Sequence, residues 1–131
     1  MEILSVIVAA VAAFAFGAVW YMSLSAQWIR ASGVPVGPDG KPANNTSKAP
    51  FVIGILAMIV VAGMMRHIFG MAGIDSLGKG ALAGLGTGAF IAVPWLAMNY
   101  GFAGRAPALT LIDGANCVAG CTIMGSVLGL M

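Results

Sequence analysis

Four long apolar runs, almost free of charge, dominate the pattern of hydrophobic and polar positions along this sequence. They span residues 3–24, 51–72, 80–100 and 107–131. Each run reaches the roughly 20 apolar residues with which a helix crosses a hydrocarbon core of ~30 Å. The pattern predicts one domain over residues 1–131 with an all-α fold. We expect a polytopic membrane protein whose four transmembrane helices form an antiparallel bundle.

The segments between the runs determine how the helices connect. Residues 25–50 form a long loop rich in Pro and Gly, whereas the other two connections are short, so the helices they join should be antiparallel neighbours. Asp75 or Ser76 is expected to cap the third helix. Pro50 suits the first turn of the second helix, and Pro94 should kink the third helix about six residues before its end.

The composition agrees with a membrane location. Of the 131 residues, 60% are hydrophobic and only 8% are charged, against about 25% charged in an average soluble domain. The first run follows Glu2 instead of a basic segment and is long for a secretory signal, so we expect a retained helix. The lipid bilayer is the expected surrounding. The scattered basic residues argue against nucleic acid as a partner.

Basic residues also predict the orientation, because cytoplasmic loops of membrane proteins carry an excess of Lys and Arg. Four basic residues flank the first and third connections, and two lie toward the other side. They are Arg30, Lys41, Lys48 and Arg105 against Arg66 and Lys79. We therefore expect the loop 25–50 on the cytoplasmic side, with both the N- and C-termini on the opposite side.

Small residues recur every four positions on three of the helices, which in lipid favours close helix packing. The positions are Ala9, Ala13 and Gly17; Gly80, Gly84 and Gly88; and Cys117, Cys121, Gly125 and Gly129. These stripes predict tight packing, either within one bundle or between subunits. The sequence leaves both possibilities open.

One carboxylate, Asp113, lies inside the fourth run, ~9 Å from its start at 1.5 Å per residue. A charged side chain inside a membrane requires partners. Counting inward from the same side on the other helices predicts a polar layer at this depth, with an indole N–H, Tyr21, Asn99 or Arg105 as partners of Asp113. The predicted layer comprises Asp113, Asn116, Arg105, Asn99, Trp95, Trp20 and Tyr21.

This layer has more than one interpretation. Asp113 is a structural clamp between the first, third and fourth helices, a proton or ligand site, or a carboxylate that only reaches toward the interface. All Trp and Tyr residues fall near the same side of the predicted bundle, where they form an interfacial belt or line a site.

No catalytic set is recognisable elsewhere. The single histidine, His67, is predicted at a different depth from Asp113. Met64, Met65, Cys117 and Cys121 lack the spacing of a copper motif, and Arg66 is expected to extend toward the headgroups. We therefore expect no enzymatic activity, no cofactor and no bound metal.

The two ends of the chain resemble a family of small bacterial membrane proteins catalogued only as a domain of unknown function. The matching features are Trp20-Tyr21, Trp28, Gly104-Arg105, Leu111-Ile112-Asp113, Met124-Gly125 and Leu128-Gly129. The resemblance implies a four-helix protein of the bacterial inner (cytoplasmic) membrane, which with the predicted orientation makes both termini periplasmic. It implies no activity.

Three functions fit these features. A structural or accessory membrane protein, acting as a homo-oligomer or as a subunit of a larger membrane complex, explains the small-residue stripes and the missing catalytic set. A small transporter or channel would use Asp113 as its coupling group and would need a polar path across the membrane. A lipid or small-molecule sensor would use the aromatic layer as a pocket.

Overall fold

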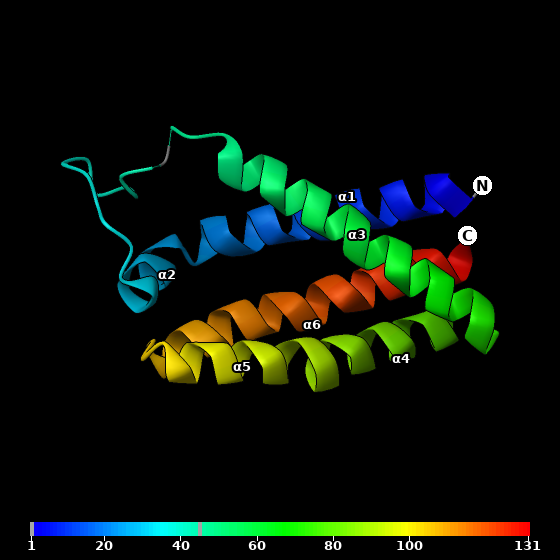
Figure 1. Cartoon of the computed structure of the whole chain (residues 1–131). Coiled ribbons are helices and arrows are strands. Elements are labelled where there is room, and N and C mark those ends of the chain that lie inside the picture. The colour runs from blue at the N-terminus through cyan, green and yellow to red at the C-terminus, as the bar shows by residue number, and fades with distance from the viewer. Residues whose placement is uncertain (1, 45) are drawn as a thin grey trace.

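The computed structural model describes residues 2–44 and 46–131, which fold into a helical bundle (Figure 1). Four of its helical segments are long and apolar enough to cross a membrane: Glu2–Ser23, Ala49–Ala72, Leu77–Phe102 and Pro107–Leu130. The all-α prediction is confirmed. Both termini lie at one end of the bundle, and the long connection lies at the other (Figure 1).

The first connection contains a helix that the sequence analysis did not identify. Helix α1 (Glu2–Ser23) gives way at Leu24 to α2 (Ser25–Ser32). Helix α2 ends at Gly33, which adopts the left-handed conformation (φ 66°) that terminates many helices. An eight-residue helix with mixed polarity has no long apolar run, so hydropathy alone does not reveal it.

Helix α3 (Ala49–Ala72) crosses α1 and packs on it, with Pro50 in its first turn as predicted (Figure 1). Helix α3 buries only three residues, Ala62, Met65 and Phe69, all in its C-terminal half. They join alanines of α1 and two residues of α6, Met124 and Leu128, in the hydrophobic core. The α1 alanines are Ala9, Ala10 and Ala13. The core is therefore concentrated toward the end of the bundle that holds the termini.

The third membrane-length segment is not one regular helix. It consists of α4 (Leu77–Thr87), a π-helical turn η1 (Gly88–Ala92) and α5 (Val93–Phe102). The Ser76 hydroxyl accepts the Lys79 backbone N–H at the start of α4, as the sequence predicted. Pro94, which cannot donate a backbone hydrogen bond, lies in the first turn of α5, directly after the wide turn, so the helix is irregular next to the residue where a kink was predicted.

Helices α4 and α6 (Pro107–Leu130) make the closest approach in the bundle. Added Cβ atoms on Gly80 and Gly84 would collide with the carbonyl oxygens of Gly125 and Cys121, respectively. A Cβ on Gly129 would collide with the backbone carbonyl at the start of α4, and one on Gly88 would lie 2.6 Å from the Val118 Cα. The small-residue stripes of these two helices therefore pack against each other within one chain.

Candidate functional site

Asp113 on α6 joins three helices. The Tyr21 hydroxyl of α1 donates to its Oδ1 at 2.6 Å, and the Tyr100 hydroxyl of α5 donates to its Oδ2 at 2.5 Å. Each carboxylate oxygen thus has one tyrosine donor. Hydrogen bonds to a charged acceptor are stronger than those between neutral groups. The arrangement fixes the rotation and height of α6 against two neighbouring helices.

The C-terminal part of α1 makes a second contact with α6, at Ile112, the residue before Asp113. The Trp20 indole N–H donates to the Ile112 carbonyl at 2.9 Å. Consecutive residues of α1 thus bind consecutive residues of α6, since Trp20 and Tyr21 reach Ile112 and Asp113. Trp20 was expected as a partner of the carboxylate itself, but the indole binds the neighbouring backbone.

The family model described as "Protein of unknown function (DUF1761)" matches residues 4–129. The chain belongs to the DUF1761 family. No curated protein and no solved structure matches it.

In this DUF1761 chain, Arg105 lies at the rim of the site and ties α2 to the turn before α6. Its guanidinium donates to the Ser32 carbonyl at the end of α2, at 3.0 Å. Among the described residues, Arg105 forms no ion pair with Asp113; the two recorded ion pairs are Glu2–Arg66 and Asp75–Lys79. The carboxylate therefore has hydrogen-bond donors but no paired positive charge.

A cavity of about 370 Å³ lies beside the carboxylate, between α2 and the facing ends of α5 and α6. Asp113, Tyr100 and Trp28 contribute to its wall, and Arg105 and Ser32 line it as well. Trp28 also meets Tyr21 edge to face, with ring centroids 6.2 Å apart. The previously unidentified helix α2 thus supplies one wall of the site.

Asn116 lies outside this hydrogen-bonded set. Its half-buried side chain faces a groove of about 730 Å³ between α1 and α3. An added Cβ on Gly17 would lie 3.4 Å from the Asn116 Oδ1, so the amide rests against the glycine of α1. No side-chain hydrogen bond joins Asn116 to the described residues. The polar layer predicted from depth is therefore two sites, one around Asp113 and one at the groove.

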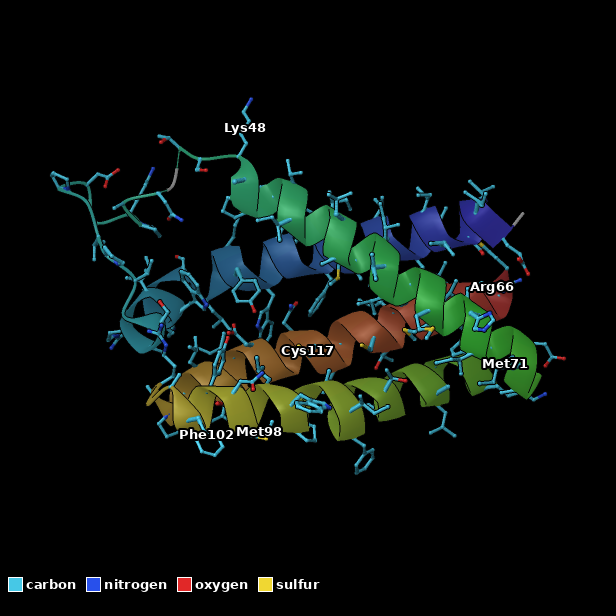
Figure 2. The ribbon with its side chains drawn as sticks, in the orientation of Figure 1. Lys48, Arg66, Met71, Met98, Phe102 and Cys117 are labelled. Carbon is cyan, nitrogen blue, oxygen red and sulfur yellow. The ribbon has the colours of Figure 1, made fainter. Side chains whose placement is uncertain are left out.

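Two residues of the predicted layer point elsewhere. Asn99 is exposed, and Trp95 has 62% of its surface exposed on the outer side of α5. Met98 and Phe102 project from the same outer side (Figure 2). Neither Asn99 nor Trp95 reaches Asp113, which corrects their assignment to the layer.

The π turn explains this correction. In an unbroken α-helix at about 100° per residue, Trp95 and Asn99 would both lie within about 20° of the direction of Gly88, which faces α6. The wide turn at Gly88–Ala92 holds roughly one extra residue, so later side chains are rotated back by about 100°. Tyr100 then takes the inward direction that Asn99 would have had. The sequence signal for this shift is Pro94.

The opposite end of the bundle holds a separate polar group. Arg66 on α3 lies beside the end of α6 (Figure 2), where it donates to the Leu128 carbonyl at 3.0 Å. Its Nε is 4.0 Å from the Glu2 carboxylate, and 24% of its side chain is exposed. A cation at the C-terminal carbonyls complements the helix dipole. Arg66 therefore binds within the chain, and its extension toward the headgroups stays a prediction.

Proposed function

We propose that this DUF1761 protein is a structural or accessory protein of the bacterial inner (cytoplasmic) membrane. It acts as a homo-oligomer or as a subunit of a larger membrane complex and has no enzymatic activity. The observation that carries the proposal is the sparse packing of the N-terminal half of α3, which buries no residue before Ala62. A helix with so little internal packing gains stability from a neighbouring protein helix.

The groove between α1 and α3 has the character of a surface for another helix. Its wall is almost entirely apolar and includes Phe14, Met22, Phe51 and Met58, while the Asn116 amide supplies a polar point. Helices in lipid associate through close packing and through hydrogen bonds between polar side chains. An amide without a hydrogen-bond partner among the described residues supports association with a helix that offers a donor or acceptor.

The orientation is part of the proposal. The end that carries α2 also carries Arg30, Lys41, Lys48 and Arg105, and Lys48 projects outward from the start of α3 (Figure 2). The other end carries two basic residues, Arg66 and Lys79, and Lys79 pairs with Asp75. The excess of basic residues at the α2 end supports a cytoplasmic α2 and periplasmic termini.

The transporter or channel alternative has less support. Such a protein needs a polar route that continues past Asp113. Toward the termini the bundle centre is filled by the buried residues Ala13, Met124 and Leu128. His67, the only histidine in the chain, lines a cavity at the far end with Glu2 and Arg66, so the two polar ends are separated by apolar packing.

Crosslinking in native membranes, followed by mild extraction and native electrophoresis, tests the proposal. Asn116→Leu and Ala18→Trp alter the groove and are expected to reduce assembly. Asn99→Leu and Ala15→Trp are matched controls, because both positions are exposed and neither lines the groove. A parent protein that runs as a monomer under gentle extraction would contradict the proposal, as would groove variants that assemble like their controls.

A further inference from the structure

The cavity beside Asp113 combines three features: a carboxylate that pairs with no cation in residues 2–44 and 46–131, aromatic walls and room for a small molecule. We propose that this cavity binds a small organic cation, a quaternary ammonium or a protonated amine. This inference does not rest on the proposed assembly through the α1–α3 groove, although Trp28 lines both that groove and this cavity.

The hydrogen bonds around Asp113 come from hydroxyl groups only. Both carboxylate oxygens accept from a tyrosine hydroxyl, and neither tyrosine brings a positive charge. Hydroxyl donors orient the carboxylate but supply no opposite charge to it. A negative charge near the low-dielectric interior attracts a mobile cation more strongly than one in water.

The walls of the cavity favour an organic cation over a hydrated metal ion. Trp28 and Tyr100 line it, together with the apolar side chains of Leu109, Val34 and Pro35. A metal ion needs several oxygen ligands, whereas a quaternary ammonium is held by aromatic rings and a nearby negative charge. The volume of about 370 Å³ lies at the small end of the range for ligand sites.

Arg105 gives the site a competing internal cation. Its guanidinium lines the same cavity while one of its N–H groups is held by the Ser32 carbonyl. A bound organic cation is therefore repelled by Arg105 and attracted by Asp113. Removal of the guanidinium should strengthen binding, whereas an anionic ligand would show the reverse dependence.

Calorimetric titration of the purified full-length protein with tetraethylammonium chloride at constant ionic strength tests the site. We expect saturable binding by the parent, at least tenfold weaker binding by Asp113→Asn and several-fold tighter binding by Arg105→Gln. Asp75→Asn is the control, since this carboxylate is exposed and pairs with Lys79 at the other end.

Trp28→Leu serves as a second variant because the Trp28 ring lines the cavity without donating to Asp113. It should weaken binding even if Asp113→Asn fails to fold, and circular dichroism identifies that failure. Absence of saturable binding to the parent overturns the proposal. Equal affinity of the parent and Trp28→Leu, or a loss of affinity in Asp75→Asn, also overturns it. These titrations measure cation binding and not oligomer retention, so the assembly proposal is tested separately by Asn116→Leu and Ala18→Trp, neither of which lines the cavity.

Discussion

Tyr100 and Asp113 are joined by a hydrogen bond of 2.5 Å that depends on a π turn eight to twelve residues before the tyrosine. If the same residues formed a regular α-helix from Gly88 to Tyr100, the hydroxyl would point away from α6. The turn at Gly88–Ala92 is therefore linked to the polar site, although it contributes no polar side chain to it. Functional sites are a common location for such turns.

Removal of either tyrosine hydroxyl should destabilise the bundle. Tyr21→Phe and Tyr100→Phe each remove one donor from the Asp113 carboxylate, with an expected loss of about 1–2 kcal/mol. Thermal unfolding in detergent, followed by circular dichroism, measures the effect. Trp95→Phe is the control because this exposed ring makes no contact with the site. Tyrosine variants that unfold at the parent temperature would show that the two bonds contribute nothing to stability.

The π turn allows a test of side-chain direction. Deletion of Phe90 together with Pro94→Ala should restore an unbroken helix in which Tyr100 follows Gly88 by eleven residues, within about 20° of its direction. The Tyr100 hydroxyl should then still reach Asp113, and Tyr100→Phe should remain destabilising in that background. Insertion of one alanine after Ala97 should instead rotate Tyr100 by about 100° and destabilise the protein as much as Tyr100→Phe does. Equal melting temperatures for the deletion and insertion variants would contradict this account.

The parts of the structure that depend on local pattern could be predicted from the sequence. The four apolar runs locate the membrane-length helices, and Ser76 caps α4 because a hydroxyl at that position satisfies a free N–H. The depth of Asp113 and the presence of Tyr21 near the same level led to one of its two donors.

The remaining parts depend on relations that the sequence does not state directly. The assignment of Asn99 and Trp95 to the site assumed a regular helix through Pro94, and one extra residue in a turn reverses that assignment. Helix α2 lies between two apolar runs, and its Trp28 acquires a role only when α2 folds back over α6. The direction in which the α5 side chains point and the position of α2 over α6 are set only when the whole bundle assembles.

Close contact between α4 and α6 predicts that alanine substitution at two glycines of α4 changes stability very differently. Gly84→Ala places a Cβ against the Cys121 carbonyl and should lower the free energy of unfolding by ~1–3 kcal/mol. The atoms that the Cβ meets belong to the α6 backbone and cannot rotate away. Gly86→Ala meets nothing within 4 Å and should be neutral or stabilising by up to about 1 kcal/mol through helix propensity. Comparison of the two melting temperatures checks the contact. Similar values would indicate that α4 and α6 lie further apart.

Substitution of Asp113 distinguishes the structural role of the site from a functional one. Asp113→Asn retains one oxygen acceptor, so it should keep one tyrosine bond and destabilise the protein by about 1 kcal/mol. Asp113→Leu leaves both hydroxyls without an acceptor and should cost about 2–4 kcal/mol. Thermal stability and oligomer retention in detergent should therefore decrease in the order parent, Asn, Leu. If the Leu variant is as stable as the Asn variant, the carboxylate does not hold the helices together. If the Asp113→Asn protein assembles normally but no longer binds tetraethylammonium, the negative charge is needed for ligand binding, whereas the acceptor oxygen atoms stabilise the fold.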